Sequence, residues 1–414
     1  MFSEFRHKLR TQRFYCTVYI LGTALSVASV MLLVIFIHIR LSPIYPEVNR
    51  SNTYYIDSVV RIESDGSVNE SGCVPAAFTD SIKRALGPDA KISVSYRDYF
   101  YASVQHFTTY AGRPDTPVQI MPRFTDPDFF RIYEFEFLEG GPFSAADLES
   151  GLRHAVITDR LARRVFGSAT GVVGRDIPIN HTTFKVVGVV REASVLCEDS
   201  FAQIYMPYTS MPQQDWSRLG CCLGKDALTI VTNDRDKLES VVNELVRRHN
   251  SSVTDGHIMR LAAGVTPHAN SNKIGLFIAL IVLFLVVPSL NLSGLIAGDM
   301  DARLPEMGIR KAFGARRGRL LRRIIVDNIA LSTIGGLTGL ILAWIGMSSW
   351  AWRFSSSHRL PSVDVTVNPD MLFSFGIFAA AFLFCMLVNV ASSFIPAWWS
   401  LRKPAVKALN ENKR

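Results

Sequence analysis

Residue types that could carry out catalysis are sparse in this 414-residue chain. The single Gly-Lys pair, Gly224–Lys225, is followed by Asp226 and lacks the rest of a phosphate-binding loop. The motifs H-E-x-x-H, C-x-x-C and G-x-S-x-G are absent, and the histidines of the middle of the chain are scattered: His106, His154, His181, His257 and His268. We therefore expect no catalytic residue and no metal site, and any ATP hydrolysis must come from another chain.

A basic loop is the feature whose composition and order most favour a function. Residues 302–328 contain eight Lys and Arg, interrupted by Pro305, Gly308 and Gly314. The glycines permit tight turns or close backbone approach, and Glu306 stands where a carboxylate favours the start of a helix. Anchoring a membrane protein needs the positive charge alone, whereas the order P-E-M-G-I-R-K-A-F-G-A favours contact with another protein.

Four apolar stretches surround this loop and place the chain in a membrane. Asp, Glu, Lys and Arg are absent from 14–39, 274–298, 328–352 and 371–401. Each stretch exceeds the roughly 20 residues that cross a bilayer core. We predict four transmembrane helices at 14–39, 274–298, 324–352 and 371–398, joined by loops at 299–323 and 353–370 and followed by a tail at 399–414. The first helix is too long for the apolar core of a cleaved signal peptide.

Basic residues at the helix ends orient these spans. They cluster before the first span, in the loop 299–323 and after the fourth span, whereas 41–270 is slightly acidic. The positive-inside rule then puts both termini and the loop in the cytoplasm, and 41–270 outside. The net charge of +8 is therefore a signal of topology, and nucleic acid is not an expected partner. Residues 1–13 alternate apolar and basic side chains as an amphipathic helix on the inner membrane surface would, in contact with lipid.

Within the spans, small residues recur at helical spacing. Gly22 and Ser26 in the first span, and Gly335 and Gly339 in the third, would let helices approach closely. The alternative is that glycine is simply common in membrane helices. Intramembrane polar residues are few and mostly uncharged, which counts against an ion channel or a secondary transporter.

The outer segment 41–270 is predicted to be a folded α+β domain. Two β-α-β units, 41–99 and 223–270, flank a strand-rich insertion, 100–222, and helices would cover one side of a small sheet. Within the insertion, Thr158 caps a helix that ends at Gly167. The second unit contains a helix at 237–248 with Asn233 or Asp234 as its cap.

Four cysteines fall in this outer segment, where oxidation is permitted: Cys73, Cys197, Cys221 and Cys222. They allow three pairings, and a bridge between the adjacent Cys221 and Cys222 would be strained. We favour Cys197 or Cys73 paired with one of these two. The alternative is that all four are free thiols.

Three segments carry motifs that are typical of a known family. They are E-x-G-I-R-K-A-x-G-A from Glu306 to Ala315, the run from FTDPDFFRIYEFEFLEGGPFS through HAVITDRLARRVFG to FKVVGVV, and the tail PAWWSLRKPAVKALN. On these motifs the chain resembles the FtsX/MacB superfamily of ABC transporter permeases, with a MacB-type periplasmic core domain. The resemblance covers nearly the whole chain and implies a multi-pass protein of the bacterial inner membrane.

The resemblance also implies partners. Such permeases dimerise, as homodimers or heterodimers with a like permease, and bind an ABC ATPase subunit that carries ATP and Mg. We expect no cofactor and no fused ATPase in this chain. The residues that match the docking motif are Glu306, Gly308, Arg310, Lys311, Gly314, Ala315, Arg316 and Arg317. By the same resemblance 41–99 with 223–270 is a porter-like subdomain, and a periplasmic adaptor, an outer-membrane channel or a cell-wall hydrolase is a further candidate partner.

The expected function is mechanotransmission. A non-catalytic permease subunit would pass the ATP-driven movement of its partner through the first and second spans to the outer domain, and would thereby export or extract a periplasmic or lipid-linked substrate. One alternative is a scaffold that activates a periplasmic cell-wall enzyme. A second is a membrane sensor that works without an ATPase and whose basic loop merely anchors the spans.

Overall fold

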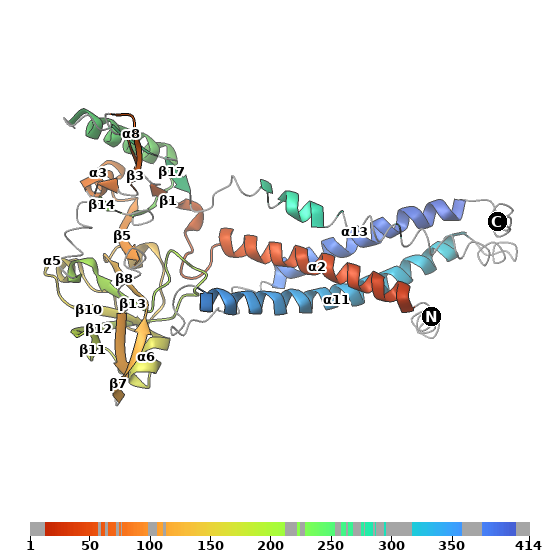
Figure 1. The fold of residues 1–414 in the computed structure, drawn as a ribbon, viewed down its shortest axis with the longest axis horizontal. Helices are drawn as coiled ribbons and strands as arrows, with labels where there is room; N and C mark the ends of the chain where they lie inside the picture. Colours follow the sequence, from red (N-terminus) through yellow and green to blue (C-terminus); the bar gives the residue numbers. More distant parts are fainter. Residues whose placement is uncertain are drawn as a thin grey trace. The chain divides into compact units, whose positions relative to one another are not determined.

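Figure 1 shows the computed structural model of the chain. It describes residues 13–402 except 57–58, 63–64, 72–73, 76, 98–105, 111–112, 212–221, 224–227, 253–257, 262–263, 268–274, 277, 285, 287–293, 295–316 and 358–374. The chain divides into two compact units. The helical unit groups Met1–His38, Ser271–Arg353 and Leu372–Arg414, and the sheet unit groups Ile39–Asn270 and Phe354–Met371.

The helical unit is built on three long helices, α2 (Arg13–Leu41), α11 (Arg317–Ser357) and α13 (Phe375–Arg402). Among the described residues, α2 and the stretch Ile325–Ser349 of α11 are long and apolar enough to cross a membrane, and α13 contains a shorter apolar stretch, Phe382–Ser392. Residues 1–12, most of the second predicted span and the end of the tail lie outside the described residues. Four spans therefore stay the prediction of the sequence.

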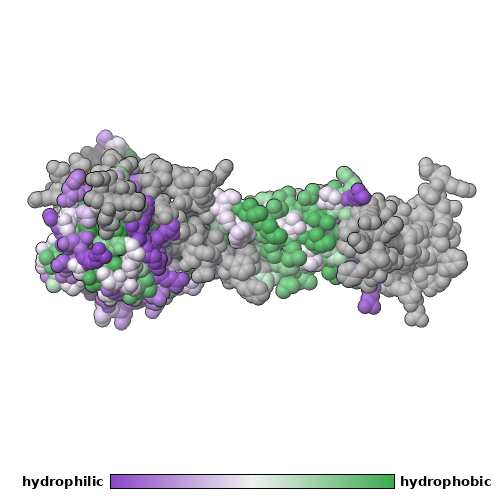
Figure 2. All heavy atoms as spheres, turned by 90° about the horizontal axis from the view of Figure 1, so that it is seen from below, coloured by the Kyte–Doolittle hydropathy of each residue, from purple (hydrophilic) through white to green (hydrophobic). Residues whose placement is uncertain are grey.

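These helices expose apolar side chains on their outer surface and pack through small ones. Figure 2 shows an apolar surface over these helices. Their exposed apolar side chains include Leu25 on α2 and Trp344 on α11. Inside the unit, Ala28 and Met31 of α2 form a buried cluster with Ala343 of α11 and Cys385 of α13. An apolar exterior around a close-packed interior fits helices whose surroundings are lipid.

The sheet unit holds the remaining elements. Its strands are β1 (Thr53–Ile56), β2 (Val59–Ile62), β3 (Val68–Ser71), β4 (Val74–Pro75), β5 (Lys91–Arg97), β6 (His106–Tyr110), β7 (Arg113–Ile120), β8 (Pro122–Thr125), β9 (Phe137–Gly140), β10 (His154–Thr158), β11 (Asp176–Ile179), β12 (Thr182–Val190), β13 (Ile204–Pro207), β14 (Cys222–Leu223), β15 (Leu228–Val231), β16 (Ile258–Leu261) and β17 (Val265–Pro267). Its helices are α3 (Ala77–Leu86), α4 (Phe129–Ile132), α5 (Ala145–Glu149), α6 (Asp159–Phe166) and α8 (Arg235–Ser252), with 3-10 turns η1 (Arg50–Asn52) and η2 (Tyr208–Ser210).

One ten-stranded sheet runs through both the predicted β-α-β units and the predicted insertion. Its order is β11-β12-β10-β13-β8-β5-β15-β1-β17, with β9 also paired to β12. The sequence predicts a small sheet with a separate insertion, and the structure differs because β5 pairs antiparallel with β8, opposing Tyr96 to Phe124. Smaller sheets flank it, formed by β16-β2-β3, β6-β7 and β14-β4. The two parts of the domain therefore share one backbone hydrogen-bond network.

Alternating residues of this sheet enter two cores. In β13, Ile204 and Met206 join a core that includes the apolar faces of α3, α6 and α8, whereas Tyr205 joins an aromatic core around α4. Successive side chains of a strand point to opposite faces, so both faces of the sheet are covered. The predicted helices on one side correspond to the first core, and the aromatic cluster on the other side was not predicted.

The helix α6 forms where local signals place it. The Thr158 hydroxyl accepts a hydrogen bond from the backbone N–H of Leu161, and Gly167 ends the helix with a φ of +81°. Leu161, Ala162 and Val165 are buried. A hydroxyl at the N-cap and a left-handed glycine at the end satisfy the free backbone groups of a helix. The same logic applies to α8, where the Asp234 carboxylate accepts from the backbone N–H of Lys237.

A buried carboxylate joins the two parts of the sheet. Asp126, which follows β8, accepts hydrogen bonds from Ser93 Oγ at 2.7 Å, from the backbone N–H of Val94 in β5 at 2.8 Å and from that of Phe129 in α4 at 3.1 Å. Burial raises the pKa of this carboxyl from 3.8 to about 6, because the loss of hydration outweighs the hydrogen bonds from Val94 and Ser93 and the attraction of Lys83.

We predict that this group makes the stability of the protein depend on pH. The folded chain holds the Asp126 proton more tightly than the unfolded chain does, so the contribution of Asp126 to the free energy of unfolding should be largest below pH 4 and should be lost as the pH rises through about 6. The change is on the order of 3 kcal/mol. Thermal unfolding of the detergent-solubilised chain at several pH values measures it. Asp126→Asn is the control, because it should flatten the profile over this range, and an equally steep profile for this variant would contradict the assignment.

Candidate functional site

The structure does not describe the predicted docking residues from Glu306 to Arg316, so their role stays a prediction. Arg317, the last of the set, is the first residue of α11. The predicted docking motif therefore ends where the described α11 begins. This helix begins inside the predicted loop 299–323, several residues earlier than the predicted third span.

Three of the four small residues singled out in the spans lie at contacts between helices. A Cβ added to Gly335 would lie 2.8 Å from Thr23 Cβ, and one added to Gly339 would lie 2.5 Å from the carbonyl oxygen of Ala24. Ser26 is buried and its hydroxyl donates to the carbonyl of Phe284 at 3.1 Å. Gly22 is half-buried on α2.

The cysteine hypothesis is wrong for Cys197. This residue is a buried free thiol, whose Sγ lies 3.6 Å from Arg50 Nη2 and 3.7 Å from the Tyr45 carbonyl oxygen. It is enclosed by the segment that follows α2, which no sequence pattern indicated. Burial and the nearby Glu47 carboxylate raise the thiol pKa, which disfavours the reactive thiolate as long as this site stays closed.

A disulfide between Cys73 and Cys221 or Cys222 is compatible with the structure. Cys222 lies in β14, where it is opposite Pro75 of β4, two residues beyond Cys73 in the sequence. The Cys73 and Cys221 positions themselves lie outside the described residues. A bridge between Cys73 and either Cys221 or Cys222 stays the prediction.

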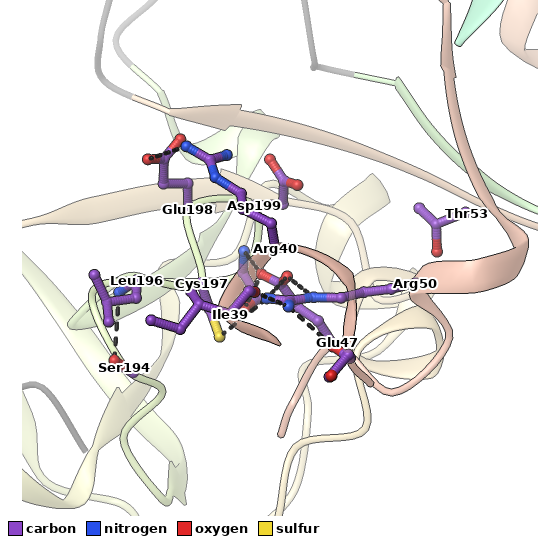
Figure 3. A network of polar contacts seen from close by, with 12 residues as sticks. Ile39, Arg40, Glu47, Arg50, Thr53, Ser194, Leu196, Cys197, Glu198 and Asp199 are labelled. Atoms are coloured by element: carbon purple, nitrogen blue, oxygen red, sulfur yellow. Dashed lines mark hydrogen bonds and ion pairs between the residues drawn. The ribbon is translucent and has the colours of Figure 1, made fainter. Parts of the chain in front are cut away.

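A buried ion pair at the end of α2 was missed in the sequence. Arg50 and Glu47 have side chains only 3% and 2% exposed, and Arg50 donates to one Glu47 carboxylate oxygen from Nε at 2.8 Å and from Nη2 at 2.7 Å (Figure 3). The E-x-x-R spacing places both side chains on the same turn, where η1 begins. This spacing is typical of exposed ion pairs on a helical turn, so the sequence alone does not predict that the pair is buried.

Arg50 also closes the end of α2. Its Nη1 donates to the carbonyl oxygen of Ile39, in the last turn of the helix, and to that of Ser42 at 3.0 Å. The final carbonyl groups of a helix have no partner within it and carry partial negative charge, so a guanidinium there satisfies and stabilises them. The last turn of α2, the guanidinium and the chain at Glu47 are thus one hydrogen-bonded assembly inside the sheet unit.

The second oxygen of Glu47 binds a loop far along the chain. Its Oε1 accepts from the Ser200 backbone N–H at 3.0 Å and from the Ser200 hydroxyl at 2.7 Å. Beside it, the Tyr45 hydroxyl donates to the Arg191 carbonyl at 2.9 Å. The residues Ile39, Ser42, Tyr45, Glu47, Arg50, Cys197 and Ser200 form what we call the junction. It fixes the segment after α2 to the loop between β12 and β13.

Electrostatics show how strongly the two charges depend on each other. Burial disfavours the charged guanidinium, but the Glu47 carboxylate, with a smaller contribution from Asp199, outweighs it and raises the pKa of Arg50. Asp199 in turn accepts a 2.8 Å hydrogen bond from the buried Tyr55 hydroxyl of β1, whose pKa burial raises well above its ordinary value. Through Asp199, the loop that holds Cys197 and Ser200 therefore also contacts β1, which lies between β15 and β17 near one end of the sheet.

The groups of the junction have a structural role, because they hold the chain after α2 in place. The side chains of Tyr45, Glu47, Arg50 and Ser200 are all engaged in hydrogen bonds or ion pairs. Over the described ranges, no group of three His, Cys, Asp or Glu lies close enough to hold a metal ion. A network of buried groups paired in this way holds the chain after α2 in one geometry.

We predict that breaking the ion pair on one side destabilises the protein strongly. Arg50→Met leaves the Glu47 carboxylate buried without its partner, which typically costs 3–5 kcal/mol, and the double variant Glu47→Leu with Arg50→Met should recover a large part of that loss. Thermal unfolding of the solubilised chain measures both. Arg40→Gln is the matched control, because the Arg40–Glu198 pair is half-exposed and should contribute less than about 1 kcal/mol. Equal losses for Arg40→Gln and Arg50→Met would contradict the assignment.

We also predict one disulfide that excludes Cys197. The free thiols of the denatured chain should increase on reduction, and Cys73→Ser should abolish this increase because its partner is then left unpaired. Cys197→Ser is the control, since it should lower the count equally before and after reduction. An increase that survives in Cys73→Ser and disappears in Cys197→Ser would reverse the assignment.

Comparison with known proteins identifies the architecture in which this junction lies. Residues 17–248 match the family model of the MacB-like periplasmic core domain, and residues 276–405 match that of the FtsX-like permease C-terminal domain. The first match alone covers more than half of the chain, and the two together include both the junction and the basic loop.

Two curated relatives are consistent with these family models. A pyoverdine export ATP-binding/permease protein from Pseudomonas savastanoi pv. phaseolicola is 27% identical over 317 residues, which are 75% of this chain and 44% of the relative. A macrolide export ATP-binding/permease protein from Agrobacterium fabrum is 27% identical over 298 residues, 68% of this chain and 42% of the relative. The chain thus matches less than half of the length of either relative.

A solved structure adds a weak likeness. The periplasmic region of MacB from Actinobacillus actinomycetemcomitans has a TM-score of 0.36 and 12% identity, covering 56% of this chain and 94% of that one. A score this low carries no weight beside the family models. On those models, the chain belongs to the FtsX/MacB-like family of ABC transporter permeases, as a membrane protein with a MacB-like periplasmic core domain and an FtsX-like permease domain.

Proposed function

We propose that this chain is the non-catalytic permease subunit of an ABC exporter that works by mechanotransmission. An ABC ATPase, which carries ATP and Mg, binds the cytoplasmic loop 299–323 and moves it when it hydrolyses ATP. The helices pass the movement to the periplasmic domain, which drives out a periplasmic or lipid-linked substrate. The permease works as a dimer with a second copy or a like permease in the bacterial inner membrane, with both termini in the cytoplasm.

The observation that carries this proposal is the junction. α2 is a single helix whose last turn is bound by a buried guanidinium that is also paired to Glu47, and Glu47 in turn binds Ser200 within the sheet unit. A flexible tether would suffice for a domain that merely sits outside the membrane. A buried, fully paired ionic network at this point is suited to transmitting force, because a displaced partner would leave an uncompensated buried charge.

The relatives support the direction of transport. Two of them are named for the export of different substances, pyoverdine and macrolides, and both are named as ATP-binding as well as permease proteins. We extend to this chain the class of process, which is export coupled to an ABC ATPase. A periplasmic adaptor and an outer-membrane channel are the accessory partners that such a route requires.

The docking role of the basic loop gives a direct test. Replacing Arg310 and Lys311 by glutamate reverses charge inside the motif from Glu306 to Ala315, and should abolish recovery of an ABC ATPase with the tagged chain, because like charges across an interface are strongly unfavourable. The measurement is the ATPase activity and the identity of proteins that co-purify from mildly solubilised membranes. Equal recovery of the ATPase with the variant and with the unmodified chain would contradict docking at this loop.

The matched control changes the same charge elsewhere on the cytoplasmic side. Replacing Arg402 and Lys403 by glutamate removes two positive charges after the last helix and should leave the ATPase bound. Loss of the ATPase in both variants would indicate a general effect of charge on the membrane topology. Recovery of a well-folded unmodified chain without any ATPase would overturn the proposed function itself.

A further inference from the structure

Within the helical unit, α2 and α11 pack against each other over several turns. Tyr19 Oη and Ser332 Oγ lie 2.9 Å apart in a buried hydrogen bond. The contacts that follow pair Gly335 with Ile20 and Thr23, Gly339 with Ala24 and Val27, and Gly346 with Leu32. The residue numbers rise together on the two helices, so α2 and α11 run in the same direction.

This parallel pairing bears on the topology. Two spans that cross a membrane in the same direction require the chain between them to cross back an odd number of times. The predicted second span, 274–298, supplies that crossing. The basic loop then lies on the same side of the membrane as the start of α2, as the positive-inside rule predicts.

The approach of the two helices leaves no room for a side chain. A Cβ on Gly335 would lie 3.0 Å from the Ile20 carbonyl oxygen, and one on Gly339 would lie 2.5 Å from that of Ala24. These obstacles are backbone atoms, which cannot turn away as a flexible side chain can. By comparison, a Cβ on Gly275 or Gly294 of the second predicted span would meet nothing within 4 Å among the described residues.

The same contacts oppose sliding of one helix along the other. A slide of α11 by one turn would bring Leu331 or Ala343 to a place that only a glycine fits, and would separate Tyr19 from Ser332. A hydrogen bond in an apolar surrounding has no water to replace its lost partner. The pair can therefore tilt or move as a unit more easily than its members can move past each other.

We propose that α2 and α11 form one rigid lever, so that movement of the loop 299–323 enters α11, passes sideways into α2 through Gly335 and Gly339, and reaches the junction at Arg50. The inference rests on the proposed function and deepens it. The sequence alone assigned the movement to the first and second spans, whereas these contacts assign it to the third and the first. Gly335 and Gly339 act as positioning residues.

The test is Gly339→Ala, with Gly346→Ala as the matched control. A Cβ at Gly346 would lie 3.8 Å from two Leu32 methyl carbons, an ordinary contact, whereas one at Gly339 forces the helices apart. The readout is the rate at which a maleimide labels Cys197, followed by mass spectrometry of its peptide, in the complex with its ATPase, with and without ATP and vanadate. Cys197 is buried against Arg50, so it reports movement that arrives at the junction.

We expect the unmodified complex and Gly346→Ala to show a nucleotide-dependent change in the labelling rate, and Gly339→Ala to lose this change while it keeps the ATPase bound and hydrolysing ATP. The same response in Gly339→Ala and Gly346→Ala would overturn the rigid lever. No response in the unmodified complex would instead contradict the proposed function at the junction, so the two failures are distinguishable.

A second variant covers the case in which Gly339→Ala does not fold. Tyr19→Phe combined with Ser332→Ala removes the hydrogen bond between the helices without adding volume. Its labelling response should be weaker than that of Thr333→Ala, a control that removes only a hydroxyl bonded within α11 to the Ile329 carbonyl. A full response in the Tyr19→Phe/Ser332→Ala variant would count against the lever.

Discussion

The path of the chain immediately after α2 depends on the requirement that two buried charges remain paired. Arg50 and Glu47 are almost completely removed from water, and neither can lose the other without a penalty of several kcal/mol. Their remaining hydrogen-bonding groups are taken up by the carbonyls of Ile39 and Ser42 and by Ser200. Such a pair adds little net stability compared with a well-packed apolar core, but it tolerates only one geometry. The segment after α2 is therefore specified more precisely than hydrophobic packing alone would achieve.

The two units solve the problem of rigidity by different means. In the helical unit, where both the interior and the surroundings are apolar, close contact depends on the absence of side chains at Gly335 and Gly339. In the sheet unit it depends on a single sheet with a core on each face and on the ionic junction. Glycine contacts between helices would give little specificity in water, and a buried ion pair would cost much free energy in lipid. Each is found where its surroundings make it effective.

Local signals in the sequence predicted local structure well, and long-range pairing decided the rest. The cap at Thr158 and the stop at Gly167 were confirmed because both act within one turn of their own helix. The continuity of the sheet was not predicted, since the β5–β8 pairing joins segments whose own patterns say nothing about each other. Burial of the Glu47–Arg50 pair likewise depends on Cys197 and Ser200, about 150 residues away along the chain. The resemblance identified the family, but the docking residues remain a prediction from the motif.

The position of β1 has a consequence for the synthesis of the protein. This strand, the first of the sheet, lies between β15 and β17, which are among the last to be made, with Tyr54 opposite Ile230 on one side and Pro267 on the other. The sheet cannot close until the whole segment up to β17 has left the ribosome and crossed the membrane. Pairings between such distant strands form slowly, and their edges stay exposed meanwhile. β1 therefore stays without either of its neighbours until nearly the whole outer segment has been made.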